Sequence, residues 1–292
     1  MLESPFMRVL LTGATGFIGS HVARDFLRRG HDVHVTLRPA SVRRRIRDIE
    51  SKLRIWEGDM DALPVEVDVV VHLAWYAVPG KYLAAPENRE CLEASRRLLA
   101  KAKGRVVFVG SCFEHDLTLG LLREDSATKP ITLYAECKDA LRREVEVRPN
   151  SAWVRLFYQY GPGEDERRLM PAVMLAQLRG QPSKVSTGEE RLDYLYIEDV
   201  ASAIRRVAES RLQGCVNIGS GLAPSVREIV TKIAGLGGRP ELIQWGAYQR
   251  RPSDPMLVQA DPAKLRSTGW APRIGLDEGL RQAFDWWRRE LQ

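Results

Sequence analysis

The sequence is poor in cysteine and has no long hydrophobic run, and each absence excludes a class of protein. Four cysteines in 292 residues are too sparse for a disulfide scaffold and are not spaced like metal ligands. We therefore predict reduced thiols, no metal site and a cytoplasmic location. The most hydrophobic stretch, residues 65–75, is interrupted by Glu66 and Asp68, and the opening residues lack the basic and apolar regions of a signal peptide. We predict no export and no membrane partner.

Glycine and proline are also too few to indicate a fibrous or disordered chain, because 23 Gly and 16 Pro are scattered through a sequence that is 44% hydrophobic. A chain of this length and composition is expected to be globular. The net charge is only +6 and is spread thinly along the sequence, so we predict no nucleic-acid partner. Most of the basic residues are arginine, whose guanidinium group suits phosphates.

The first half of the chain alternates short β-branched runs with longer amphipathic stretches. This pattern predicts an α/β fold with a parallel sheet covered by helices on both faces. Helices are expected over residues 17–29, 88–103 and 134–147, and strands over residues 8–12, 32–37, 53–56, 67–73, 105–110 and 152–157.

After residue 160 the chain is broken into shorter pieces by closely spaced glycines and prolines. We predict a first domain over residues 1–160 and a smaller carboxy-terminal α/β lobe over residues 161–292. The boundary between the two parts is not sharp, and the chain can return from the second part to the first. A last helix is expected over residues 277–290.

Three glycines, at positions 13, 16 and 19, run from the end of the first expected strand into the first turn of the first expected helix. Their spacing lets the loop turn tightly, brings the backbone close to a pyrophosphate and points helix N–H groups at the anion. Because the loop follows the first strand of an alternating α/β pattern, it favours a dinucleotide site in a Rossmann-type, doubly wound sheet over a plain strand-to-helix turn. The residues expected at the cofactor are Gly13, Thr15, Gly16, Phe17, Ile18 and Gly19.

The end of the second expected strand indicates which dinucleotide is bound. An Asp or Glu there usually accepts the adenosine ribose hydroxyls, but this chain has Arg38, followed by Ser41. A guanidinium suits a 2′-phosphate, so we predict NADP(H), with NAD(H) as the alternative. Asp59 and Met60, after the third strand, are expected at the adenine, with an ordinary strand-end turn as the alternative. The next arginines, Arg44, Arg45 and Arg47, are interpreted as a solvated helix face.

Tyr134 and Lys138 are four residues apart at the start of an expected helix, so their side chains should share one face. A solvated helix face would show the same spacing. A neighbouring ammonium and an oxidised nicotinamide would lower the pKa of the phenol into a working range. Ser111 ends an expected strand at the edge where a parallel sheet presents its ligands. We predict Ser111, Tyr134 and Lys138 as catalytic residues, with Tyr134 and Lys138 also contacting the cofactor.

Together these features resemble the extended branch of the short-chain dehydrogenase/reductase superfamily. The glycine loop of that branch is typically Thr-Gly-x-x-Gly-x-x-Gly, which residues 12–19 match. Its catalytic Ser or Thr, Tyr and Lys correspond to Ser111, Tyr134 and Lys138. Asn88 matches an asparagine that supports the active site in the branch.

Two further segments resemble the same branch. The run His-Leu-Ala-Trp matches its His-x-Ala-Ala segment except at Trp75, which implies cofactor contacts for Leu73 and Ala74. Residues 155–162 resemble its Arg-x-x-Asn-x-Tyr-Gly-Pro segment, with Tyr158 in the asparagine position.

The carboxy-terminal lobe is similar to that of nucleotide-sugar epimerases, dehydratases and reductases, and we place the chain nearest to the 4-ketoreductases. In that group the small lobe clamps a nucleoside diphosphate, and Arg251 corresponds to the group's arginine. Arg191 lies one position before the usual phosphate-binding arginine. The resemblance implies a nucleotide-diphosphate sugar as substrate, bound by Trp75, Ser111, Cys112, Tyr158, Arg191 and Arg251.

One departure from the group's pattern argues against dehydration. Sugar 4,6-dehydratases carry Asp-Glu directly after the catalytic hydroxyl residue, whereas Cys112 and Phe113 follow Ser111 here and neither can serve as acid or base. Glu114 and His115 are interpreted as a strand-end carboxylate and a solvated histidine.

We therefore predict an NADPH-dependent reduction of a keto group on a nucleotide-diphosphate sugar, most plausibly a 4-keto-6-deoxyhexose. The first alternative is an NAD-dependent 4-epimerase, and another is a reductase of a non-nucleotide ketone. A redox sensor that binds NADP without turnover is the alternative of a different class. Because dimers are common in the resembled family, we also predict a homodimer.

Overall fold

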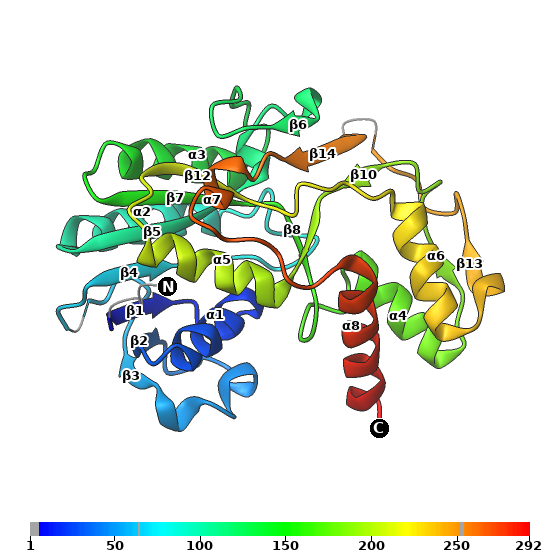
Figure 1. Cartoon of the computed structure of the whole chain (residues 1–292), viewed down its shortest axis with the longest axis horizontal. Coiled ribbons are helices and arrows are strands. Elements are labelled where there is room, and N and C mark those ends of the chain that lie inside the picture. Colours follow the sequence, from blue (N-terminus) through cyan, green and yellow to red (C-terminus); the bar gives the residue numbers. More distant parts are fainter. Residues whose placement is uncertain (1–5, 64, 252–253) are drawn as a thin grey trace.

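The structure is a computed structural model that describes residues 6–63, 65–251 and 254–292. Its main sheet contains seven strands, all parallel, in the order β12, β7, β5, β4, β1, β2, β3 (Figure 1). Three of these strands are buried throughout and three more are buried at every residue but the first, as expected for strands covered on both faces. Their bounds are β1 (Arg8–Thr12), β2 (Asp32–Leu37), β3 (Arg54–Glu57), β4 (Val69–His72), β5 (Arg105–Ser111), β7 (Ser151–Leu156) and β12 (Gly214–Ile218).

Helices cover both faces of this sheet. α1 (Phe17–Arg28) packs on α5 (Ile197–Glu209) on one face, and α2 (Glu87–Lys101) packs on α3 (Leu133–Glu146) on the other (Figure 1). This arrangement confirms the predicted Rossmann-type α/β fold. The predicted strands and helices of the first half agree with the structure to within two residues at every end.

The smaller lobe lies to the right of the sheet in Figure 1. Its helices α4 (Leu169–Arg179), α6 (Val226–Gly237) and α8 (Leu276–Glu290) pack against one another. Its strands form one three-stranded and two two-stranded parallel sheets. These sheets join β6 (Leu121–Leu122), β14 (Leu257–Ala260) and β10 (Arg191–Leu192); β8 (Tyr158–Tyr160) and β11 (Tyr194–Tyr196); and β9 (Ser183–Lys184) and β13 (Ile243–Gln244).

The chain crosses between the two parts more than once. After β11 it returns to the main sheet, where α5 packs on α1 and β12 pairs with β7 from Gly214 to Ile218. The short helix α7 (Ala263–Arg266) also packs against β12. In the other direction, β6 precedes residue 160 but pairs with β14 of the small lobe. A division at residue 160 is therefore crossed in both directions.

Short 3-10 helices occupy several of the connections, at Arg44–Ile46 (η1), Glu50–Lys52 (η2), Cys112–Glu114 (η3), Leu117–Leu119 (η4) and Pro240–Leu242 (η5). Within the described ranges, no helix combines the length and the apolar composition needed to cross a bilayer.

Candidate active site

The glycine loop after β1 is packed so closely that side chains have no room. Gly13 has a φ of 75°, which favours glycine, and a Cβ there would lie 2.8 Å from the backbone nitrogen of Ala74. A Cβ on Gly19 would lie 2.1 Å from the carbonyl oxygen of Gly13, whereas one on Gly16 would lie 3.2 Å from the same atom. The loop therefore contacts both α1 and the segment after β4, which brings Leu73 and Ala74 to the predicted cofactor site.

This loop fits the phosphates of a dinucleotide. Gly16 is the cap of α1 and provides no side-chain hydrogen bond, so the first N–H groups of the helix are not used by a capping side chain. Such a helix terminus attracts phosphate through its N–H groups and its dipole. The predicted contacts Thr15, Phe17 and Ile18 are half-buried around the same terminus.

A buried chain of hydrogen bonds holds the end of β4 beside the loop. Thr12 Oγ1 lies 2.7 Å from His72 Nδ1, and His72 Nε2 lies 2.8 Å from Ser95 Oγ. Because the Ser95 hydroxyl donates to the carbonyl of Cys91, we assign the ring proton to Nε2. Burial lowers the pKa of His72 to about 3, with a further contribution from the charge of Lys138, so the ring is neutral.

The carboxyl ends of β2 and β3 lie side by side, joined by a 3.1 Å hydrogen bond from the Gly58 N–H to the Leu37 carbonyl. The Arg38 side chain is exposed there and makes no hydrogen bond or ion pair with any residue that the structure describes, whereas Arg43 pairs with Glu50 at 2.7 Å. This strand edge carries the residues predicted at the ribose and adenine, which are Arg38, Ser41, Asp59 and Met60.

Tyr134 and Lys138 lie in the first half of α3 with their side chains close together. Thr132 caps the helix, and its hydroxyl accepts the Ala135 N–H at 3.2 Å. The Tyr134 N–H donates to the Leu83 carbonyl at 3.0 Å. The Lys138 Nζ lies 6.0 Å from the centroid of the Tyr134 ring. The structure thus brings these two predicted residues together.

The direction of the Tyr134 pKa differs from the prediction. Burial raises the pKa of the phenol, and a hydrogen bond with Ser111 opposes this effect only in part. The Lys138 ammonium donates to the Val109 carbonyl at 2.7 Å, and burial lowers the pKa of Lys138 to about 7. The predicted lowering concerns a site that also holds an oxidised nicotinamide, whereas in the chain by itself burial sets the opposite direction. Tyr134 carries its proton.

Ser111 ends β5 and caps the short helix η3. Its hydroxyl accepts the Phe113 N–H at 3.3 Å, and its own N–H donates to Glu114 Oε1 at 2.7 Å. This reciprocal pair is a capping box. It fixes the Ser111 backbone at the carboxyl edge of the sheet, where its hydroxyl meets Tyr134.

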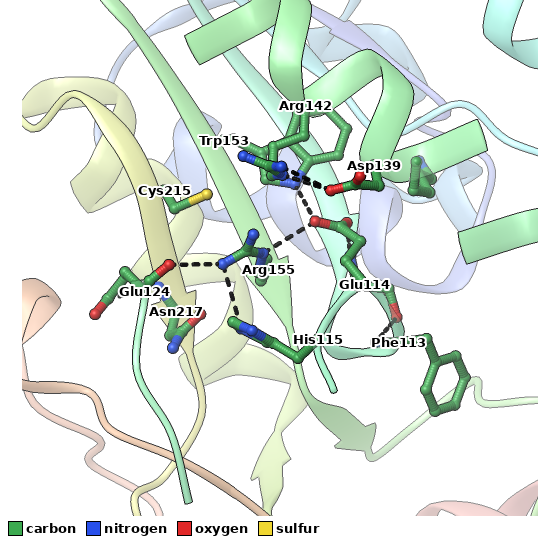
Figure 2. A network of polar contacts seen from close by, with 12 residues as sticks. Phe113, Glu114, His115, Glu124, Asp139, Arg142, Trp153, Arg155, Cys215 and Asn217 are labelled. Carbon is green, nitrogen blue, oxygen red and sulfur yellow. Dashed lines mark hydrogen bonds and ion pairs between the residues drawn. The ribbon is translucent and has the colours of Figure 1, made fainter. Parts of the chain in front are cut away.

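Figure 2 shows the polar network around Glu114 and Arg155. Glu114 accepts hydrogen bonds from the Trp153 indole at 2.8 Å and from Arg155 Nε at 3.0 Å, and Arg155 also donates to His115 Nε2 at 3.3 Å. Glu114 and Arg155 are almost completely buried, and His115 is only 1% exposed. The interpretation of His115 as solvated is therefore wrong. Glu114 was not predicted as a site residue, although the Ser-x-x-Glu spacing of a capping box is a signal that could have found it.

Aromatic side chains surround Tyr134. Its ring contacts the Tyr82 ring edge-on at 4.9 Å and the Trp75 ring edge-on at 6.3 Å. The Arg168 guanidinium carbon lies 5.4 Å from the centroid of the Tyr82 ring, which adds a positive charge to this cluster. The sequence gives no signal for Arg168, because it lies just before α4 and no local spacing connects it with Tyr134.

The remaining residues predicted to bind substrate lie in different surroundings. The half-buried Tyr158 starts β8 and contacts the Phe113 ring at 6.3 Å. The side chain of Cys112 is buried in an apolar cluster with its neighbours from the small lobe, so it does not face a pocket. Arg191 in β10 and Arg251 before β14 are exposed in the small lobe, outside the aromatic cluster around Tyr134.

Comparison with known families decides how this site is interpreted. Residues 9–219, more than half of the chain, match the NAD dependent epimerase/dehydratase family. The chain belongs to this family. It is an NAD(P)-dependent enzyme of the extended short-chain dehydrogenase/reductase type, as the sequence motifs predicted.

Relatives within the epimerase/dehydratase family match along the whole chain. The UDP-glucose 4-epimerase of Bacillus subtilis is 26% identical over 334 residues, which cover 96% of each protein. The structure of MoeE5 in complex with UDP-glucose and NAD is 30% identical, with a TM-score of 0.78 over 98% of this chain and 100% of that chain. The structure of TunA, an NAD dependent NDP-hexosamine 5,6-dehydratase of tunicamycin biosynthesis, is 28% identical, with a TM-score of 0.79 over 97% and 98%.

Proposed function

We propose that the protein uses NADPH to reduce a keto group of a nucleotide-diphosphate sugar, and that this group is the 4-keto group of a 6-deoxyhexose. The observation that carries the proposal is the exposed, unpaired Arg38 guanidinium at the end of β2, within the part of the chain that the structure describes. A 2′-phosphate on the adenosine ribose would give this guanidinium an anionic partner. NADP(H) suits net reduction, whereas an epimerase retains its cofactor.

In this proposal Tyr134, which keeps its proton in the chain by itself, is the proton donor. A bound nicotinamide dinucleotide supplies the hydride for such a reduction. Tyr134 donates its hydroxyl proton to the carbonyl oxygen of the sugar and becomes a phenolate. The Lys138 ammonium, held near the Tyr134 ring, stabilises that phenolate. The Ser111 hydroxyl donates a hydrogen bond to the same carbonyl oxygen and orients it.

Substrate recognition is assigned to both parts of the chain. Arg191 and Arg251 would contact the diphosphate, because a guanidinium offers paired donors to phosphate oxygens. Trp75 and Tyr158 would line the sugar. The homodimer and the cytoplasmic location also stay predictions.

An NAD-dependent 4-epimerase is the second candidate. It is favoured by the 26% identity with the UDP-glucose 4-epimerase of Bacillus subtilis and by the NAD that accompanies UDP-glucose in the MoeE5 structure. The same three catalytic residues would serve, with Tyr134 removing the hydroxyl proton from C4 and later returning it.

The test compares two reactions of the purified protein. A nucleoside-diphosphate 4-keto-6-deoxyhexose is supplied with NADPH, and UDP-glucose is supplied with NAD⁺. Loss of NADPH absorbance together with an alcohol product two hydrogens heavier supports the reductase. Conversion of UDP-glucose into UDP-galactose without net change in NAD⁺ would overturn it in favour of the epimerase.

Two variants tie the activity to the site. Tyr134→Phe removes the proton donor and should lower the turnover rate by roughly 100- to 10,000-fold, whereas Tyr248→Phe, at an exposed side chain, should leave it unchanged.

Arg38→Asp should weaken NADP⁺ binding by about ten- to hundred-fold and leave NAD⁺ binding unchanged. Equal loss for both dinucleotides would contradict the assignment of NADP(H).

A further inference from the structure

Trp75 stands where the resembled family has alanine, and its indole reaches the catalytic lysine. The centroid of the ring lies 3.6 Å from Lys138 Nζ, which is close enough for a cation–π contact. The same indole meets the Tyr134 ring edge-on at 6.3 Å. One side chain therefore contacts both members of the Tyr/Lys pair.

Asn88 holds the indole in this position. Trp75 Nε1 donates to Asn88 Oδ1 at 2.7 Å, and the Asn88 amide donates to the carbonyls of Tyr82 and Ala85 at 2.6 Å and 2.8 Å. Asn88 is fully buried and all of its side-chain polar atoms are used, so its orientation is fixed by the backbone. The indole plane is fixed in turn.

Two groups enclose the Lys138 ammonium. It donates to the Val109 carbonyl at 2.7 Å, and the indole face of Trp75 covers another side. Lys138 is 3% exposed, so very little water reaches it. One of the three N–H donors of the ammonium is used by the Val109 carbonyl. The indole limits the directions in which the other two can point.

We propose that Trp75 is a positioning residue for Lys138, whose indole face stabilises the charged ammonium in a site that excludes water. An apolar side chain of similar size would exclude water equally well but would offer the ammonium no negative π face. Trp75 therefore excludes water from the lysine and at the same time favours its charged form over the neutral one. The consequence for catalysis rests on the role of Lys138 in the proposed function, whereas the contact itself does not.

The other titratable groups that face Lys138 come from four elements. Burial raises the pKa values of the Cys91 and Cys137 thiols, of Glu114 and of Tyr134. It lowers the pKa of His72 to about 3. Burial lowers the pKa of Lys138 to about 7, so the lysine titrates near neutral pH. These neighbours are His72 on β4, Cys91 on α2, Glu114 on η3, and Tyr134 and Cys137 on α3.

The first experiment tests the contact without any substrate. The tryptophan emission of the Trp75→Phe variant is subtracted from that of the wild type across the neutral pH range, which isolates the emission of Trp75. We expect this emission to change in one titration step near pH 7 in the wild type and to stay flat in Lys138→Met. A flat Trp75 emission in the wild type, or a step that persists in Lys138→Met, would overturn the proposal.

The second experiment tests the catalytic consequence with two variants of Trp75. Trp75→Leu keeps an apolar side chain that excludes water from Lys138 but has no π face, whereas Trp75→Phe keeps a π face. The loss of the π face should lower the Lys138 pKa, so the alkaline limb of kcat against pH should move down by about one pH unit in Trp75→Leu and by less in Trp75→Phe. Matching melting temperatures would show that both variants are folded.

Profiles that coincide for the wild type and both variants would overturn the positioning role. Should the keto sugar and NADPH give no turnover at all, the proposed function fails, and the fluorescence titration still decides whether Trp75 holds the lysine. Failure of the two proposals is therefore distinguishable.

Discussion

The carboxylate of Glu114 connects Ser111, which we propose as a catalytic residue, with the interior of the protein. It accepts the Ser111 N–H on one oxygen and the Arg155 and Trp153 N–H groups on the other. Gly110 makes room for it, because a Cβ there would lie 2.1 Å from Glu114 Oε1. The position of Ser111 therefore depends on the buried ion pair between Glu114 and Arg155.

Removing the charge of Glu114 should destabilise the fold. In Glu114→Gln the buried Arg155 charge loses its partner, which typically costs about 3 to 5 kcal/mol of unfolding free energy. The matched control is Glu66→Gln, because the Glu66 side chain is 85% exposed and its pair with Lys103 lies in solvent. Urea unfolding of the three proteins measures the difference. Equal midpoints for Glu114→Gln and the wild type would contradict this account.

Single residues could be predicted where their signal is local. Tyr134 and Lys138 are one helical turn apart, and Ser111 ends a hydrophobic strand, so sequence alone brought them to one sheet edge. The contact of Trp75 with Lys138 could not be predicted in the same way, because it joins the end of β4 to α3. The direction of the Tyr134 pKa depends on burial, which no spacing reveals.

At the scale of elements, the glycine loop and the start of α1 are in close contact. A substitution at Gly19 tests whether this contact matters for cofactor binding. In Gly19→Ala the new Cβ would lie 2.1 Å from the Gly13 carbonyl oxygen, so the loop must shift, at a cost of about 1 to 3 kcal/mol. Dinucleotide binding should be lost with it. Thermal unfolding and titration with NADP⁺ measure the two effects.

Gly235→Ala is the control for this substitution. Gly235 lies within α6 and a Cβ there would meet nothing within 4 Å, so alanine should leave stability unchanged or raise it by up to about 1 kcal/mol. If Gly19→Ala bound NADP⁺ as tightly as Gly235→Ala, the close packing of the loop would not matter for the cofactor.

Elements could be predicted where the hydrophobic pattern is long enough to have a period. β1 and β2 agree with their predicted bounds at both ends, and α8 begins one residue before the predicted start. By contrast, β6, β9, β10 and β13 contain two residues each, which is too short to show any alternation. Their pairing is set by the packing of the small lobe and not by their own sequence.

At the scale of the whole molecule, burial keeps three histidine side chains neutral. Burial lowers the pKa of His21 to about 4, that of His72 to about 3 and that of His115 to about 4. His21 lies on α1 and its Nε2 is 3.0 Å from the Pro162 carbonyl, so it joins the main sheet region to the turn that follows β8. Because burial disfavours the charged imidazolium, protonating any of them costs folding free energy.

These histidines predict acid sensitivity. Their folded pKa values lie below the ordinary value near 6.5, so the unfolded chain binds more protons at lower pH and stability falls as pH decreases from about 6.5 towards 4. Each histidine can remove up to about 1.4 kcal/mol per pH unit in this window. Urea unfolding at about pH 7.5 and about pH 5 checks this. His21→Gln should show a shallower decrease, and an unchanged midpoint in the wild type would contradict the prediction.

The path of the chain was harder to predict than its fold class. The alternation of strands and helices indicated a doubly wound sheet, but nothing in residues 214–218 marks β12 as its seventh strand. That strand is recognised only by its partner, since Cys215 and Val216 pair with Trp153 and Val154 on β7. Long-range pairing of this kind has no local sequence signature.

The return of β12 to the sheet has a practical consequence. By that point the chain has already contributed α4 and β9 to the small lobe, so the two parts are threaded through each other. A protease nick near residue 160 would not release two self-sufficient fragments. The amino-terminal fragment would be left with β7 as a bare edge, whose open backbone groups invite pairing with another chain and hence aggregation.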